Sequence, residues 1–201
     1  MVLIRMSTGR ALTVAFVALM LAAVAPAPSV DAQTYQGREL VTAELVADTT
    51  SIQPGNPFTV GVLMRMAPHW HTYWKFPGDA GIATEIKWKL PPDWKVGEIQ
   101  WPTPLRLVEP GDIHVYGYHG EVLLMQEITP PASLPPGPVK LAAEANWLVC
   151  EKICIPGSAT VELDVPSGGS AAAANEELFA QYRRALPQPW PADDVAAATW
   201  T

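Results

Sequence analysis

The sequence predicts an all-β fold, an antiparallel β-sandwich followed by one short helix near the C-terminus. From residue 38 onward, apolar residues repeatedly alternate with polar ones, which is the pattern of strands with one buried and one solvated face. The 21 Pro among 201 residues exclude a mostly helical fold, because Pro breaks helix interiors. No helical segment separates the alternating runs, so a parallel sheet is not expected.

About seven strands follow from this alternation, with turn clusters of Pro and Gly between them. The clearest alternation covers residues 41–47, 58–66 and 84–90, and a Gln-Pro-Gly-Asn-Pro turn signal precedes the second run. The remaining expected strands are 94–101, 121–129, 139–149 and 159–165.

One helix is expected after the strands. Asn175 is a candidate N-cap, and acidic residues in the first turn and basic residues in the last turn suit the helix dipole. The apolar side chains on one face of this helix are Leu178, Phe179, Tyr182 and Leu186. The Ser/Gly/Ala-rich stretch 167–174 before the helix predicts a linker, and the prolines that follow the helix exclude regular structure in the tail.

The first 32 residues have the pattern of a secretory signal peptide. Arg5 and Arg10 precede an apolar run of 14 residues, which is shorter than the roughly 20 residues needed to cross a bilayer. Small residues end at Ala32, so we expect cleavage before Gln33 and export. The expected organisation is a signal peptide at 1–32, a β domain at 33–166, and a linker, short helix and Pro-rich tail at 167–201.

The composition excludes several kinds of partner. The whole chain has a formal net charge of −7 at pH 7, and removing two Arg and one Asp with the signal peptide makes it −8. Because the chain is acidic and has no basic run, we expect it to bind neither nucleic acid nor an anionic membrane. No segment after Ala32 is long and apolar enough to span a bilayer, so no membrane insertion is expected after cleavage.

Cys150 and Cys154 form the sharpest candidate site. An exported chain with two cysteines usually forms one disulfide, and a corner between two strands would place these sulfurs in bonding range. A ring of this size stabilises a fold by only about 2 kcal/mol, against nearly 5 kcal/mol for a loop of about 100 residues. Glu151 and Lys152 make exposure of the ring expected, exposed disulfides exchange readily, and Lys152 favours a nearby thiolate. The spacing leaves open a redox pair, a stabilising disulfide and a metal-ligand pair.

The segment 67–81 carries more aromatic residues than an ordinary solvated loop. It could form a pocket wall or a partner-docking surface, where Trp and Tyr are favoured. Alternatively, its rings close one end of the sandwich, which suits Trp74 and Phe76. The candidate docking residues are His69, His71, Tyr73, Trp74 and Asp79, together with Trp147 beside the cysteines. An acid–base pair of Asp79 and Glu109 finds no support in their spacing.

A copper site is another interpretation of the same region. His69, His71 and His114 offer imidazoles, and Met64, Met66 and the cysteines offer soft sulfur ligands that suit copper. However, Met64 and Met66 fall on the inward stripe of their strand, which favours core packing, and a His-x-His pair alone is a weak signal. We therefore assign no metal or other cofactor and keep copper binding as an alternative.

Residues 111–120 predict a movable loop. Glycines at both ends and in the middle allow conformational freedom, and the aromatic residues between them could cover a site. A surface hairpin is the alternative.

These segments together resemble the N-terminal periplasmic domain of the DsbD family of thiol:disulfide interchange proteins, including its ScsB-like branch associated with copper tolerance. The likeness covers about 38–166 and is carried by His69-Trp70-His71-Thr72-Tyr73-Trp74, Pro77-Gly78-Asp79-Ala80-Gly81, Trp101-Pro102-Thr103-Pro104, Tyr116-Gly117-Tyr118 and Trp147 through Pro156. It implies an immunoglobulin-like periplasmic domain, connected with cytochrome c biogenesis. Such a domain receives electrons from a membrane-embedded thiol-redox donor and passes them to exported thioredoxin-fold proteins.

The resemblance also implies residue roles. Cys154 would form the intermolecular disulfide and Cys150 would resolve it. A cap loop that shields the pair would comprise His114, Val115, Tyr116, Gly117 and Tyr118. The best-known relatives separate the cysteines by more than three residues and continue into a membrane domain and a thioredoxin-like domain. We therefore expect a fragment or a stand-alone domain with a borrowed donor, which leaves autonomous reductase activity open. The alternative is a non-catalytic immunoglobulin-like binding module with a structural disulfide.

Overall fold

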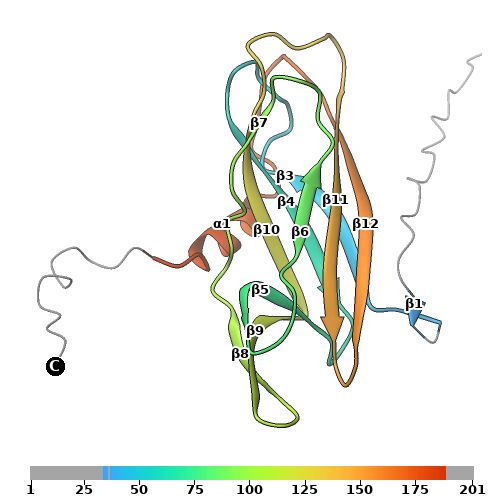
Figure 1. Ribbon diagram of the computed structural model, residues 1–201. Helices are drawn as coiled ribbons and strands as arrows, with labels where there is room; N and C mark the ends of the chain where they lie inside the picture. Colours follow the sequence, from blue (N-terminus) through green and yellow to red (C-terminus); the bar gives the residue numbers. More distant parts are fainter. Residues whose placement is uncertain (1–33, 36, 189–201) are drawn as a thin grey trace, which may run out of the picture.

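The computed structural model describes residues 34–35 and 37–188, so the predicted signal peptide and the end of the Pro-rich tail lie outside the described residues. Two antiparallel sheets pack face to face, and one helix, α1 (Glu176–Arg184), lies beside them (Figure 1). The predicted all-β sandwich with a short C-terminal helix is confirmed. Within the described ranges, no helix is long and apolar enough to cross a membrane.

The first sheet has four strands, and three of them match the predicted runs. Their order across the sheet is β3 (Val41–Ala47), β4 (Phe58–Met66), β10 (Glu121–Thr129) and β7 (Lys95–Val96). The predicted strand 94–101 is much shorter than expected. Val96 pairs with Ile128 and Gln100 pairs with Met125. The chain therefore advances four residues from Val96 to Gln100 while its partner strand β10 advances three. This extra residue interrupts the ladder as a β-bulge does.

The second sheet has six strands and contains both cysteines. Its strands are β12 (Cys154–Val165), β11 (Val139–Cys150), β5 (His71–Gly78), β9 (Ile113–His119) and β8 (Leu105–Glu109) in that order, with β6 (Glu85–Trp88) also pairing with β11. Because β11 has 12 residues, it pairs with β6 along its middle and reaches β5 only at its last residue, Cys150 opposite His71. A separate short ribbon joins β1 (Thr34–Tyr35) to β2 (Arg38–Glu39).

Besides the two-residue strands β1 and β2, three strands were missing from the sequence prediction. The segments predicted as an aromatic loop and a movable cap loop are strands β5 and β9, and β8 forms a hairpin with β9 around a turn at Pro110 to Asp112. In β5, three successive residues from His71 to Tyr73 are buried, so no polar–apolar alternation marks the strand. Figure 1 shows β5, β8 and β9 together at the lower end, beside the tip of the β11–β12 hairpin.

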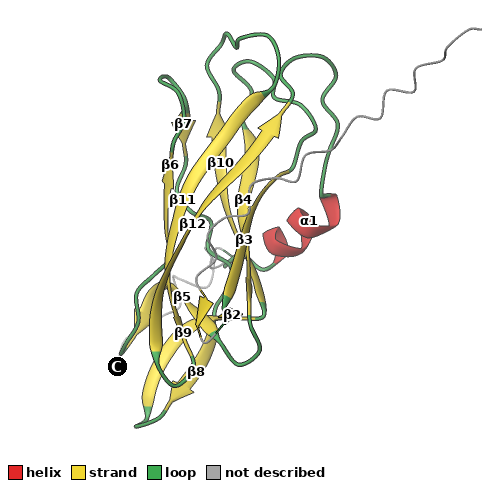
Figure 2. Cartoon of the chain, turned by 90° about the vertical axis from the view of Figure 1, so that its right-hand side faces the viewer, coloured by secondary structure: helices red, strands yellow, loops and turns green. Residues whose placement is uncertain are grey.

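The main core lies between the two sheets, and α1 contributes to it. Phe179 and Tyr182 are buried in the core, and the helix lies beside β3 and β4 (Figure 2). Asn175 occupies the N-cap position as predicted, but it adopts a left-handed conformation with φ 52° and its side chain makes no capping hydrogen bond. Its side-chain amide instead donates to the Ala47 carbonyl at 2.9 Å, which ties the start of the helix to β3.

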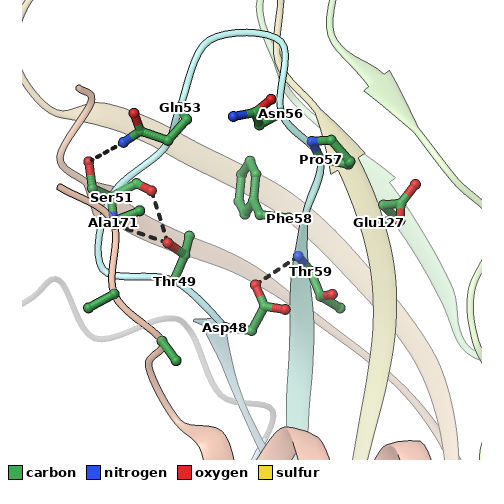
Figure 3. Close-up of a pocket in the computed structure, with 12 residues that line it drawn as sticks. Asp48, Thr49, Ser51, Gln53, Asn56, Pro57, Phe58, Thr59, Glu127 and Ala171 are labelled. Carbon is green, nitrogen blue, oxygen red and sulfur yellow. Dashed lines mark hydrogen bonds between the residues drawn. The ribbon is translucent and has the colours of Figure 1, made fainter. Parts of the chain in front are cut away.

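The predicted linker stretch is hydrogen-bonded to the connection between β3 and β4. Thr49 bridges to Ala173, Ile52 bridges to Ser167, and the Thr50 N–H donates to the Ala172 carbonyl at 2.9 Å. A surface cleft lies between these segments, lined by Asp48, Thr49, Ser51, Gln53, Asn56, Pro57, Phe58, Thr59, Glu127 and residues 171–173 (Figure 3). The domain boundary at residue 166 stays a prediction.

Candidate functional site at the disulfide

Cys150 and Cys154 are joined by a disulfide at the tip of the β11–β12 hairpin. Cys150 ends β11, Cys154 begins β12, and the two residues are direct partners in the strand register, with their Cα atoms 4.2 Å apart. Adjacent antiparallel strands place paired residues at about this separation. The predicted bond at a tight corner is therefore present, and three residues connect the two strands.

The two cysteines differ sharply in exposure. Cys150 is 1% exposed and packs with Tyr73 and Val115, with Leu107 and Leu148 at the edge of this small cluster. Cys154 is exposed, as are the three turn residues before it. The expected exposure of the ring thus holds for the turn and Cys154 but not for Cys150. A thiolate arriving from solvent can reach the sulfur of Cys154 more easily.

A polar network lies against the disulfide. The Tyr73 hydroxyl donates to Glu109 Oε1 at 3.1 Å and lies 3.7 Å from the Cys154 sulfur. His71 Nε2 lies 3.0 Å from the same carboxylate oxygen. Strand geometry assembles these groups: side chains two residues apart share a face, so His71 and Tyr73 project together from β5. Thr72 projects the other way, with its hydroxyl 3.9 Å from the sulfur of Met66.

The protonation of this network follows from burial. Burial, reinforced by the charge of Glu109, raises the pKa of Tyr73 far above its ordinary value of 10.0, so its hydroxyl keeps its proton. Burial also lowers the pKa of His71 below its ordinary value of 6.5, although Glu109 opposes this. A neutral His71 beside a carboxylate is satisfied when Nε2 carries the hydrogen and donates it. Glu109 Oε1 therefore accepts from both neighbours.

Sequence reasoning missed Glu109 as part of the site. It was considered only as a partner of Asp79, and the structure does not pair these two residues. The available signal was the Pro-Gly-Asp turn after Glu109, which marks the end of a strand. With a strand at 105–109, alternation puts Leu107 and Glu109 on one face, and Leu107 does border the Cys150 cluster.

Asp79 holds the start of β9, and the predicted cap residues belong to this strand. Asp79 Oδ2 accepts the backbone N–H of His114 at 2.8 Å. The His114 side chain turns to Arg106 and Asp112, at 3.0 and 3.4 Å. Val115 is buried in the Cys150 cluster.

The other predicted cap residues differ in burial. Tyr118 is buried, and its hydroxyl donates to the Pro102 carbonyl at 2.8 Å. Gly117 pairs with Tyr73 across the two strands. Tyr116 is 37% exposed and meets Trp74 edge-on, with ring centroids 6.4 Å apart. The segment is therefore a strand of the β8–β9 hairpin, which is the alternative stated from the sequence.

The contacts of the remaining predicted docking residues are with groups other than the sulfurs. Trp74 packs against Phe76 with ring centroids 5.5 Å apart. Trp147 is buried opposite Gly157, where a Cβ atom would overlap the indole ring. His69 is an exposed turn residue with φ 74°.

The structure does not bring the candidate copper ligands together. His69 is exposed whereas His71 is buried against Glu109, so the two histidines do not form a pair. Met64 and Met66 are buried in the main core, as their strand positions predicted. In the part of the chain that the structure describes, no group of three or more His, Cys, Asp or Glu side chains could hold a metal ion.

Comparison with known proteins identifies the family. Residues 38–166 match the family described as "Thiol:disulfide interchange protein DsbD, N-terminal". The chain belongs to this family. The predicted resemblance is confirmed, and the Cys150–Cys154 disulfide lies inside the matched DsbD N-terminal region.

One solved structure supports the fold. The N-terminal periplasmic domain of ScsB from Proteus mirabilis is similar with a TM-score of 0.57 and 24% identity, covering 77% of this chain and 57% of that chain. This chain therefore spans little more than half of the ScsB domain. The reduced DsbD N-terminal domain of Neisseria meningitidis is 18% identical with a TM-score of 0.33, covering 65% of this chain and 90% of that chain. A search of curated proteins found no match.

Proposed function

We propose that the chain is a periplasmic thiol–disulfide relay domain that passes reducing equivalents to exported thioredoxin-fold proteins. The observation that carries this proposal is the asymmetry of the disulfide: the exposed Cys154 is bonded to the buried Cys150 within the matched region of a thiol:disulfide interchange family. One sulfur is thus open to a partner and the other is held nearby to complete the exchange.

The exchange proceeds by two thiolate attacks in each direction. A donor thiolate attacks Cys154, the bond to Cys150 breaks, and Cys150 leaves as a thiolate that takes up a proton. The donor's second thiol then attacks its own bonded sulfur and releases Cys154. In the second half, the Cys154 thiolate attacks a partner disulfide, and Cys150 attacks Cys154 to expel the reduced partner. Two electrons pass from donor to partner, and the original disulfide is restored.

Exposed apolar side chains provide a docking surface at the same end of the molecule. They are Phe76, Leu105, Val108, Tyr116 and Ile153, with exposures of 65, 54, 59, 37 and 47%. They come from β5, β8, β9 and the turn between the cysteines. Exposed apolar side chains near a reactive bond suit a transient protein partner.

A trapping experiment tests the assigned roles. In the Cys150→Ala variant, Cys154 can attack an oxidised thioredoxin-fold protein, but no resolving thiol remains, so a covalent mixed disulfide should accumulate. The matched Cys154→Ala variant keeps only the buried sulfur and should form at least about tenfold less adduct, because access governs exchange. The adduct is measured on non-reducing gels and should disappear with dithiothreitol.

The competing function, a binding module with a structural disulfide, predicts a different redox behaviour. A relay disulfide should be reduced in glutathione buffers at an accessible potential. Resistance to reduction until well below about −300 mV would show that the bond is structural and would end the relay proposal.

The cap is proposed to act through Val115, which covers Cys150. Val115→Ala removes two methyl groups from the cluster around Cys150, so we expect the reduced pair to react several-fold faster with iodoacetamide. Val161→Ala makes the same deletion in the main core, where Val161 is 1% exposed, and controls for general destabilisation. Equal rates for the two variants would contradict a cap role.

A further inference from the structure

Glu109 is a partly buried carboxylate that the exchange steps do not use. Its side chain is 17% exposed, and Oε1 holds contacts to His71 at 3.0 Å and Tyr73 at 3.1 Å. Burying an ionised carboxylate costs free energy unless hydrogen bonds compensate it. These two donors supply that compensation, and one of them also touches the Cys154 sulfur.

The number of hydrogens in this network limits what Tyr73 can offer to Cys154. A tyrosine hydroxyl carries one hydrogen, and an ionised carboxylate can only accept. While Glu109 takes this hydrogen, the Tyr73 oxygen presents a lone pair to the sulfur 3.7 Å away. A reduced Cys154 can donate its S–H to that lone pair. A thiolate, which only accepts, would face the lone pair with a carboxylate behind it.

We propose that Glu109 is a positioning residue that holds the Tyr73 hydroxyl turned away from Cys154 and so keeps reduced Cys154 as a protonated thiol. The negative charge of Glu109 acts in the same direction, because a nearby like charge disfavours the thiolate. His71 completes the arrangement by holding the same carboxylate oxygen, Oε1. This inference rests on the proposed function, since it concerns the nucleophile of that exchange.

Several titratable groups face this region from the surrounding elements. His71 and Tyr73 come from β5, Glu109 from β8, and His119 from β9, with the His119 ring centroid 5.3 Å from that of His71. The turn adds the exposed Glu151 and Lys152. Among the described residues, Glu109 is the carboxylate that hydrogen-bonds the Tyr73 hydroxyl.

The test is the pH profile of alkylation at a single thiol. In the Cys150→Ala chain, Cys154 reacts alone with iodoacetamide, and Glu109→Gln replaces the carboxylate with a neutral amide of equal size. A neutral acceptor competes less well for the Tyr73 hydrogen than a thiolate does, so the hydroxyl should turn to Cys154 and lower the pKa of its thiol. A pKa lower by about one unit gives about tenfold more thiolate, offset by about threefold lower nucleophilicity. We expect alkylation about threefold faster at pH 7.

At a pH above both thiol pKa values, alkylation of Cys154 should be slower with Glu109→Gln than without it, because the thiolate of lower pKa is the weaker nucleophile. The two profiles should therefore cross. A site that was merely loosened would react faster at every pH. An unchanged or raised thiol pKa in Glu109→Gln, or profiles that do not cross, would overturn the proposal.

Two further variants make the assignment specific. Glu151→Gln removes an exposed carboxylate beside Cys150 in the sequence and should leave the profile unchanged within about 0.2 pKa units, because solvent screens exposed charges. Adding Glu109→Gln to a Tyr73→Phe chain should shift the thiol pKa less than in the parent, and an equal shift would overturn the role of the hydroxyl.

Tyr73→Phe alone provides a second sign test, which also serves if Glu109→Gln does not fold. Loss of a hydroxyl that donated to the thiolate would raise the thiol pKa, whereas loss of a lone pair should not raise it. A raised pKa would therefore contradict the proposal. Because iodoacetamide needs no protein partner, these results are independent of the trapping experiment, so failure of the relay and failure of the Glu109 role can be distinguished.

Discussion

Replacing Phe179 by Ala should lower the free energy of unfolding by about 3–5 kcal/mol. Phe179 lies on α1, beyond the matched family region, yet its side chain is 0% exposed within the main core. Removing the ring leaves a cavity between elements that cannot collapse freely, which adds to the lost transfer free energy. Denaturant-induced unfolding, followed by tryptophan fluorescence, measures the change.

Gln181→Ala is the matched control on the same helix. Gln181 is exposed, and Ala is the better helix former, so this change should stay within about 0.5 kcal/mol of the parent. If Phe179→Ala also stayed within that range, the helix would contribute little to the domain, and a boundary near residue 166 would follow. A loss of several kcal/mol would instead place α1 inside the folding unit, because cavity costs arise only where a side chain is part of the core.

The sequence predicted the strands that turn signals and aliphatic residues mark, and it missed β5, whose first three residues are buried on both faces. Along 58–66 and 121–129, turn signals and β-branched or aliphatic residues marked the strands clearly. In β5, burial of His71, Thr72 and Tyr73 together reflects contact with the disulfide cluster on one face and the main core on the other. Period-two reasoning has no signal to detect in such a strand.

One part of the candidate site could be predicted from the sequence and another could not. Cys150 and Cys154 are close in the sequence, so a hairpin suffices to join them, and the disulfide could be predicted. The contact of Tyr73 with Glu109 joins residues 36 positions apart and depends on β9 lying between β5 and β8. That strand order is a tertiary property, and neither residue type nor spacing reveals it.

Replacing Gly117 by Ala should destabilise the domain by about 3 kcal/mol and expose the disulfide. Gly117 faces Tyr73 across β9 and β5, and a Cβ at this position would overlap the backbone carbonyl oxygen of Thr72. A backbone atom cannot swing aside as the end of a side chain can, so the two strands must separate locally, at a cost at the upper end of that for overpacking. Denaturant-induced unfolding measures the loss, and iodoacetamide labelling of the reduced pair should be at least about tenfold faster.

Gly97→Ala separates this effect from the general cost of adding a methyl group to glycine. Neither glycine has a positive φ, and a Cβ on Gly97 would meet its nearest neighbour, the Glu127 carbonyl oxygen, at 3.4 Å, an ordinary contact. We therefore expect a change below about 1 kcal/mol and no change in labelling. Because β9 carries Val115 and β5 carries Tyr73, separating them removes both the cover over Cys150 and the hydroxyl beside Cys154. A Gly117→Ala protein that lost stability but labelled at the parent rate would show that neither strand controls access to the sulfurs.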